Sequence, residues 1–499
     1  MQKALEADDL QMQTRLQLAA MNLHTICTGS LLTLCATTSA LAVEDGSSRP
    51  FYVPENSKYT IVDSARDSIR FTLDKTLKRD ERGHLVSISS FVNPEAEIMG
   101  WHDFGNLEGP GWAANAVGGA WEIYRWGDFL NKPEEKAKAL AILDHVLEGG
   151  FLDEQTGFIR GYRETTTGKF CLNYKHHSDW FCPGSMAKVA CQLLIFADEL
   201  GLDPRADRMR RMAVRCAAWI QQNLEPAPNG WFPRRTTPDG KLYRKSPDGG
   251  NDPYWQTSAD GLFIVQLQAA LTARSLADYR ASLKEKADVF VRAGGIFGSI
   301  NHDTYDPQEN VAYSVAFRTL LLSSRVLKND ALRRFAYEAC LAGLDQFKMT
   351  DDRNGVATKG LLYMEKSWDT SYLWENAEAA LACFEAAADT RQRDPKRARE
   401  YELDGLTILR AAAKHHHGPH GFLTEGVDWN DHVSQKHHIR QEKYGDIQYT
   451  EPFLNNQHIA EPTLFYLRNL AREAVKQGRA EWRDLEGNVL LKIRSRRNH

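Results

Sequence analysis

The sequence lacks the features that mark several large classes of protein. After residue 42, no stretch has the roughly 18 uninterrupted apolar residues that a membrane span requires. It contains no CxxC pair, dinucleotide-binding glycine motif, P-loop or HExxH, which argues against structural zinc, nucleotide-dependent chemistry and metalloprotease activity. The 62 Lys and Arg are balanced by 66 Asp and Glu, so no global basic field exists to bind nucleic acid. We therefore expect no membrane span, nucleic-acid partner, cofactor or metal.

The N-terminal region is typical of an export signal. An apolar run begins at Met21 and closes with the small-x-small pattern Ala40-Leu41-Ala42, which fits a cleavage site. We therefore predict an N-terminal extension and signal peptide over residues 1–42 and one domain over 43–499, secreted or periplasmic. In an oxidising compartment Cys171 and Cys182, which flank a loop, can form a disulfide, and the sequence leaves this open.

Beyond the signal, the 3.6-residue periodicity predicts about twelve helices and almost no strand. Asp203-Pro204 and Asp394-Pro395 each place an acceptor at an N-cap and proline at the first helical position. The predicted helices cover 61–78, 112–130, 133–149, 183–200, 204–224, 254–275, 277–293, 310–327, 330–348, 371–390, 397–414 and 455–476.

Two kinds of helix alternate along the chain. Those from 112, 254, 310 and 371 are rich in Ala, Gly and Ser with few charges, which is typical of helices buried on most faces. Those from 133, 204, 277 and 397 are amphipathic and strongly charged, as expected of an outer layer. The alternation predicts a closed ring of six inner and six outer helices.

The loops before the inner helices carry an excess of aromatic and acidic residues, for example in WHDFGNLEGPG, YMEKSWDTSY and GFLTEGVDWN. A ring would gather these loops at one end of the molecule, where function is expected. At this point residues 55–480 resemble the six-hairpin, (α/α)6-toroid carbohydrate-active enzymes, which include glycoside hydrolases and polysaccharide lyases. The segment SWDTSYLWENAEAAL is similar to the uronic-acid-acting hydrolases of this superfamily. The resemblance implies an all-α toroid with a cleft at the N-terminal ends of the inner helices.

Glycoside hydrolysis needs a carboxylic acid to protonate the leaving oxygen and a carboxylate as base or nucleophile. We rank Asp252 and Asp369 first as catalytic residues because each lies in a Gly- or Trp-containing turn before an inner helix, and Asp179 third. The alternative for each aspartate is a purely structural role as an N-cap, in which its carboxylate binds only backbone N–H groups. We expect Asp260 to lie inside its helix, buried and hydrogen-bonded.

Aromatic, histidine, arginine and acidic side chains of the same loops are expected to bind the sugar. They are Trp101, His102, Asp103, His176, His177, Trp180, Arg234, Tyr254, Trp255, Trp368, Glu375, Asp428, Trp429, His437 and Tyr444. Trp112 and Trp374 are further aromatics of this kind, with an ordinary core role as the alternative.

The leading hypothesis is an exported glycoside hydrolase that uses paired carboxylates on an acidic, uronate-containing oligo- or polysaccharide. A polysaccharide lyase is the first alternative, because Asn173-Tyr174 beside His176-His177, and Tyr444 near His437-His438, can supply a Tyr or His base. A non-catalytic glycan-binding toroid is the second. An epimerase on the same fold is a third, which no feature of the sequence favours.

Overall fold

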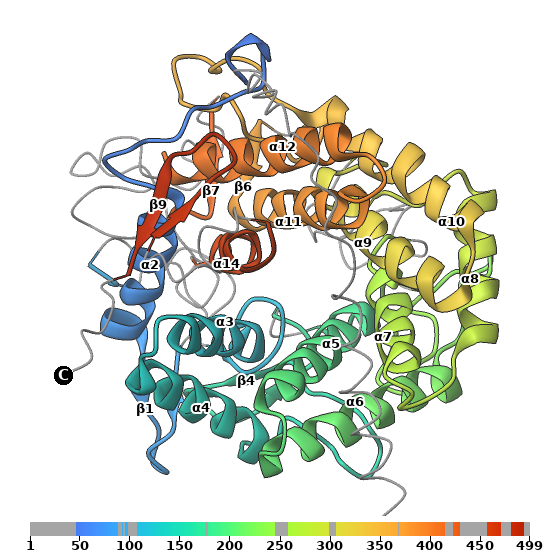
Figure 1. Cartoon of the computed structure of the whole chain (residues 1–499). Coiled ribbons are helices and arrows are strands. Elements are labelled where there is room, and N and C mark those ends of the chain that lie inside the picture. The colour runs from blue at the N-terminus through green and yellow to red at the C-terminus, as the bar shows by residue number, and fades with distance from the viewer. Residues whose placement is uncertain are drawn as a thin grey trace, which may run out of the picture. The chain divides into compact units, whose positions relative to one another are not determined.

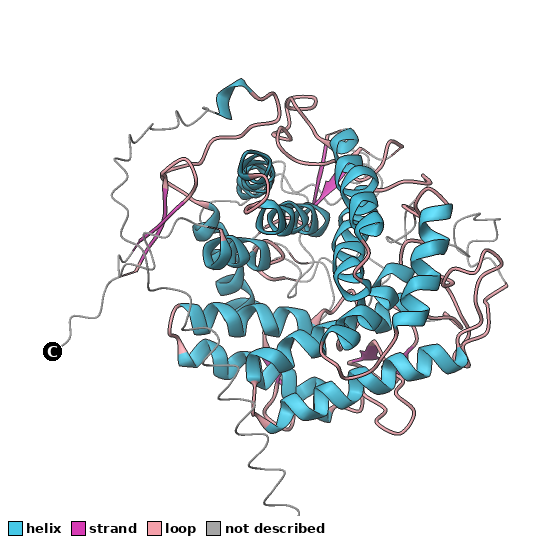
Figure 2. Cartoon of the chain, turned by 45° about the vertical axis from the view of Figure 1, so that its right-hand side comes forward, coloured by secondary structure: helices cyan, strands magenta, loops and turns pink. Residues whose placement is uncertain are grey.

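The computed structural model describes residues 46–87, 92, 95–97, 107–174, 178–244, 258–298, 306–367, 369–414, 423–429, 457–470 and 481–493. Residues 1–44 and 45–499 form two separate units, and all described residues belong to the second. The predicted extension and signal peptide at 1–42 therefore lie outside the described residues. The helices and strands of the second unit are shown in Figures 1 and 2.

Six helices form a closed inner ring. Each contacts the next along the chain, and the last, α14, contacts both α11 and the first, α3 (Figure 1). The inner helices are α3 (Ala116–Phe129), α5 (Pro183–Leu200), α7 (Gly261–Ala273), α9 (Asn310–Leu327), α11 (Leu373–Thr390) and α14 (Ala460–Asn469).

A second set of helices surrounds this ring, each packed against an inner helix. Helix α2, the first α-helix of the described chain, packs against α14, the last, and this contact closes the circle. The outer helices are α2 (Ile61–Phe71), α4 (Pro133–Glu148), α6 (Pro204–Asn223), α8 (Arg280–Arg292), α10 (Asp330–Phe335) and α12 (Pro395–Ala413). The predicted all-α (α/α)6 toroid is confirmed.

The helix starts follow from local chemistry. Asp203 and Asp394 accept hydrogen bonds from the backbone N–H groups of Arg205 and Arg397, and proline occupies the next position in both cases. Thr60 and Asp63 form a reciprocal capping box at the start of α2.

Several predicted boundaries are wrong. The helix predicted from 254 begins at Gly261, because residues 258–260 form a turn, and the helix predicted from 112 begins at Ala116. The segment predicted as one helix over 330–348 is α10 followed by a π-helical stretch, η3 (Ala336–Leu341), and a 3-10 stretch, η4 (Ala342–Phe347). Helix α2 likewise ends in a π-helical stretch, η2 (Thr72–Thr76), and a 3-10 turn, η1, covers Gly46–Ser48.

The strands of the described chain are short and pair antiparallel. They form the pairs β1–β2, β6–β7 and β8–β9 and one three-stranded sheet in the order β3-β4-β5. Their bounds are β1 Lys78–Arg79, β2 Leu85–Val86, β3 Leu107–Glu108, β4 Tyr162–Glu164, β5 Phe170–Cys171, β6 Thr370–Tyr372, β7 Gly426–Asp428, β8 Glu481–Arg483 and β9 Val489–Lys492.

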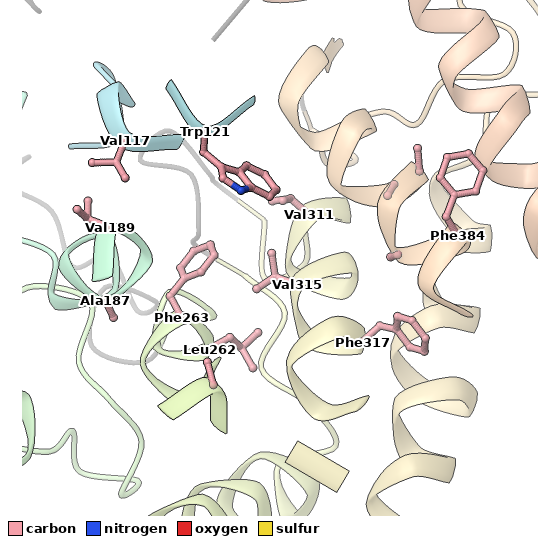
Figure 3. Packing of buried hydrophobic residues seen from close by; sticks show 14 of the residues in the cluster. Val117, Trp121, Ala187, Val189, Leu262, Phe263, Val311, Val315, Phe317 and Phe384 are labelled. Atoms are coloured by element: carbon pink, nitrogen blue, oxygen red, sulfur yellow. The ribbon is translucent and has the colours of Figure 1, made fainter. Parts of the chain in front are cut away.

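The apolar core runs continuously around the ring. Figure 3 shows Trp121 of α3, Phe263 of α7 and Val311 of α9 directed toward a shared interior, and all three are buried. Helix α7 is buried on nearly every face, whereas α8 buries only one side. Within the described residues, every helix is too short or too polar to span a lipid bilayer.

Candidate active site

A cavity of about 220 Å³ lies at the N-terminal ends of the inner helices. Residues at or just before the starts of five inner helices line it: Trp112, Asn115, Ser185, Asp260, Trp374 and His458. Strands β4 and β5 add Tyr162 and Cys171 to its wall. The cavity therefore lies where the resemblance implies a cleft.

Asp260 is the most deeply placed carboxyl group of the cavity wall. It occupies the N-cap position of α7 and is 2% exposed, and its backbone N–H donates to Ser258 Oγ at 3.2 Å. Among the residues that the structure describes, no group forms a hydrogen bond with its carboxyl oxygen Oδ2. A buried polar atom without a partner is costly unless it has another use, and in a cavity that use is to bind a ligand.

The surroundings of Asp260 bring the pKa of its carboxyl group close to neutral pH. Burial raises the pKa of this carboxyl to about 7, although the nearby charges of Arg234 and Lys188 and the backbone N–H of Gly184 oppose the shift. Arg234 is 3% exposed and also lines the cavity. A carboxylic acid that titrates near neutrality can both donate and accept a proton.

Lys188 brings a partly buried cation to the same wall. Its Nζ lies 4.2 Å from the ring centroid of Trp112 and 5.4 Å from those of Trp374 and Phe263. Burial lowers the pKa of this ammonium. The two tryptophans meet edge to face with centroids 4.9 Å apart, so Lys188 and two large aromatic faces form one side of the cavity.

His458, which precedes α14, contributes an imidazole to the cavity. Burial, with the charge of Lys188 as a second cause, lowers the pKa of His458 to about 3. The ring is therefore neutral at physiological pH and can accept a proton only at one nitrogen. Glu425 lies on the wall as well, and its backbone carbonyl accepts the N–H of Leu373 at 2.7 Å.

The β4–β5 side of the cavity is lined by Tyr162, Asn173 and Tyr174. The Tyr162 hydroxyl accepts the backbone N–H of Ala113, and the Tyr162 and Tyr174 rings meet edge to face. Cys171 and Cys182 both line the cavity as free thiols. Burial raises the pKa of Cys182 to about 12, so this thiol remains protonated.

Two of the three predicted catalytic residues lie in the described chain, and neither lines the cavity. Asp179 accepts a hydrogen bond of 2.6 Å from the Tyr243 hydroxyl. Asp369 accepts the indole N–H of Trp429 at 3.1 Å, which ties the segment before β6 to the end of β7. Asp252 lies outside the described residues. The catalytic roles of all three stay predictions.

Some of the predicted substrate-binding residues also lie in the described chain, and others lie outside it. Arg234 lines the cavity, whereas Trp180 is buried under the Arg235 guanidinium, 4.5 Å from its ring centroid. Glu375 is fully buried and accepts a hydrogen bond from Asn310 Nδ2 at 2.7 Å. The side chain of Asp428 and the following residues lie outside what the structure describes: Trp101, His102, Asp103, His176, His177, Tyr254, Trp255, Trp368, His437 and Tyr444.

The sequence analysis missed three residues of the cavity wall as functional residues. Asp260 was expected inside a helix with its hydrogen bonds satisfied, and the structure places it at a helix start with one oxygen unpartnered. Lys188 gave no signal because one lysine within an apolar helix looks ordinary. Glu425 precedes Trp429 in an acidic-aromatic loop, which was a usable signal, but other carboxylates ranked above it.

Three solved structures illustrate what the chain is similar to, since no model of a known protein family and no curated protein matches the sequence. A sugar epimerase from a ruminal bacterium aligns with a TM-score of 0.55 and 12% identity over 81% of this chain and 97% of that one. The cellobiose 2-epimerase of Spirochaeta thermophila aligns at 0.53 and 14% over 81% and 95%. A D-mannose isomerase aligns at 0.53 and 12% over 81% and 96%. At these identities the likeness shows the fold, and the chain has the predicted (α/α)6 toroid architecture of these enzymes.

Proposed function

We propose that the protein is a glycoside hydrolase that acts on an acidic carbohydrate, with Asp260 as its general acid and Glu425 as its general base. The observation that carries the proposal is the placement of Asp260. Its carboxyl group is buried at the start of α7 and lines the cavity, and its Oδ2 has no hydrogen-bond partner within the described part of the chain. Its raised pKa supports the same role, because a general acid must hold its proton at working pH.

The chemistry follows from these two carboxyl groups. Asp260 gives its proton to the glycosidic oxygen as the bond between that oxygen and the anomeric carbon breaks. Water adds its hydroxyl to the anomeric carbon, and Glu425 accepts the remaining proton. Both groups line the described cavity wall, which is the minimum that hydrolysis of a glycoside requires.

An acidic sugar suits the charges of this cavity. Arg234, which is buried, and Lys188, which is partly buried, are cations on its wall, and an arginine binds a carboxylate through two parallel hydrogen bonds. Trp112 and Trp374 offer faces of the kind on which sugar rings stack. Carbohydrates are also the substrates that the names of the three similar structures indicate for those proteins.

The proposal is tested with purified protein on uronate-containing oligosaccharides and on neutral oligosaccharides and aryl-glycosides. New reducing ends are expected from the acidic substrates. Asp260→Asn keeps the shape of the side chain but removes the acid, and loss of general acid catalysis lowers turnover by about 10²–10⁴-fold. Glu425→Gln is expected to lower it as well.

Asp179→Asn is the matched control, because it alters an aspartate that lies before an inner helix but outside the described cavity wall. It should leave most of the turnover intact. Equal losses in Asp179→Asn and Asp260→Asn would contradict the assignment of Asp260. Saturable glycan binding with no turnover of any substrate would favour a non-catalytic toroid.

A second candidate is proton transfer at a sugar carbon, as in a lyase or an epimerase. Asn173 and Tyr174 on the cavity wall favour it, because a tyrosine base and an amide that binds a carboxylate are what such reactions need, whereas the lowered pKa of His458 makes its imidazole a weak base. A lyase produces an unsaturated uronate that absorbs ultraviolet light, and an epimerase exchanges a substrate hydrogen with solvent deuterium. Either signal, abolished by Tyr174→Phe but kept in Asp260→Asn, would replace the hydrolase.

Export is a separate part of the proposal and depends on the run that closes with Ala40-Leu41-Ala42. N-terminal sequencing of the protein recovered from its native host should begin near Val43. A mature chain that still carries residues 1–42 would contradict it.

A further inference from the structure

Two histidines and an aspartate converge away from the cavity. Asp80 and His84 belong to the turn that joins β1 to β2, and His145 lies in the last turn of α4. Asp80 Oδ2 lies 2.9 Å from His145 Nδ1 and 3.4 Å from His84 Nδ1. One ligand atom from each of the three residues falls within 4.8 Å of the others.

Local structure already orients these groups. Asp80 Oδ1 accepts the backbone N–H groups of Arg82 at 2.9 Å and His84 at 2.8 Å, which turns Oδ2 toward the histidines. Gly83 has a φ of 85°, and this left-handed position lets the tight turn bring His84 back over Asp80. His145 is 2% exposed, and the buried Nδ1 of His84 forms no hydrogen bond with any residue of the described chain.

Each histidine faces a second carboxylate with its other ring nitrogen. His145 Nε2 lies 3.3 Å from Glu108 Oε2, and His84 Nε2 lies 3.4 Å from Glu148 Oε2. A histidine that binds a metal through one nitrogen almost always donates the N–H of the other to a carboxylate, a carbonyl or water. Glu108 and Glu148 lie in the positions that the carboxylate partners of metal-binding histidines occupy.

We propose that Asp80, His84 and His145 bind a divalent transition metal ion, with Zn²⁺ as the best fit, through Asp80 Oδ2 and the two Nδ1 atoms. Imidazole and carboxylate ligands suit Zn²⁺. With metal–ligand bonds of about 2.0–2.1 Å, tetrahedral ligand atoms lie about 3.3 Å apart. The two separations from Asp80 Oδ2, 2.9 Å and 3.4 Å, are close to this value, and the two histidine nitrogens lie within 4.8 Å of each other. Water completes the coordination, because His84 and Asp80 remain partly open to solvent.

The ion would join three parts of the chain. It ties the β1–β2 turn to α4, and Glu108 links His145 onward to Arg163 of β4. Tyr162, the neighbour of Arg163, lines the cavity. The metal therefore supports one wall of the candidate active site without contacting the sugar. The sequence analysis expects no metal because the chain contains no CxxC or HExxH motif, and Asp80, His84 and His145 form no such motif.

The site is tested by titrating Zn²⁺ into the chelator-treated full chain by calorimetry, with Co²⁺ as a spectroscopic probe. One equivalent of Zn²⁺ should bind and raise the Tm, and Co²⁺ should give the visible absorption of a tetrahedral complex. The Asp80→Asn/His84→Ala double variant, confined to a surface turn, should lose both signals. Glu108→Gln should weaken binding about 10–100-fold.

The sequence also contains three consecutive histidines, His415, His416 and His417. A histidine run can bind Zn²⁺ by itself, so a matched control is needed. A variant with His415, His416 and His417 all replaced by alanine should keep the binding seen in the full chain. Absence of Zn²⁺ binding at neutral pH would overturn the proposal, as would binding retained by the double variant. If the double variant fails to fold by circular dichroism, the Glu108→Gln affinity decides, and an unchanged value overturns the site.

Discussion

Gly184→Ala tests the placement of Asp260 by adding a single carbon atom. Gly184 lies in the first turn of α5, and a Cβ built there would lie 2.2 Å from Asp260 Oδ2 and 2.3 Å from its backbone carbonyl oxygen. Real Cβ atoms essentially never approach closer than 3.0 Å, so α5 and the start of α7 must move apart.

The required movement is about 1 Å, and a misplacement of this size can lower turnover about 10²-fold. Alanine forms helices better than glycine, and replacing glycine stabilises a helix by up to about 1 kcal/mol. The clash offsets this gain in folding free energy, and the variant should still fold. The assay is kcat/KM on a cleaved acidic oligosaccharide, with the Tm measured in parallel.

Gly127→Ala is the matched control. Its Cβ would lie 3.1 Å from the Lys132 carbonyl oxygen, between α3 and α4, and Gly127 does not line the cavity. It should keep wild-type turnover. Full turnover in Gly184→Ala, or an equal loss in both variants, would refute the reasoning that Asp260 works from its observed position.

Three further predictions concern charge. Since burial raises the pKa of Asp260 to about 7 from 3.8, its favourable contribution to folding is fully present below pH 3.8 and is lost as the pH rises from there through 7. We expect kcat/KM to fall above pH 7, and the Tm of Asp260→Asn relative to that of wild type to rise from pH 4 to pH 8. A flat profile from pH 6 to 9 would contradict this. Lys188→Met removes a charge-assisted contact worth about 1.5–3 kcal/mol and should raise KM for acidic substrates only; an equal rise for neutral substrates would contradict a role in binding the acid group. The side chain of Arg410 is 1% exposed and pairs with Glu55, Asp484 and Glu486. Arg410→Met leaves these three carboxylates without their cation and should destabilise the fold by about 3–5 kcal/mol, measured by thermal unfolding. A change in Tm no larger than that of a surface Arg→Met variant would refute this expectation.

The ring could be predicted because its signals are local. Asp203 and Asp394 mark helix starts within a few residues, and the alternation of apolar and charged helices repeats along the chain. The start of α7 could not be located, since residues 254–262 (YWQTSADGL) contain no proline and no glycine before Asp260 to mark a break. The helix was therefore predicted seven residues too early, and Asp260 was taken for an interior residue.

The composition of the cavity could not be predicted because it depends on distant segments. Lys188 gains its role from Trp112, in the turn before α3, and from Trp374, at the start of α11, and nothing near Lys188 in the sequence indicates them. The cluster of Asp80, His84 and His145 escaped notice for the same reason: only the fold brings α4 to the β1–β2 turn.

A crystal structure of Asp260→Asn with a bound acidic oligosaccharide would test the central claim most directly. We predict a sugar in the cavity between Trp112 and Arg234, its acid group on Arg234 or Lys188, and its glycosidic oxygen within hydrogen-bond distance of residue 260. A sugar bound outside this cavity, or one whose glycosidic oxygen lies beyond reach of residue 260, would contradict the account.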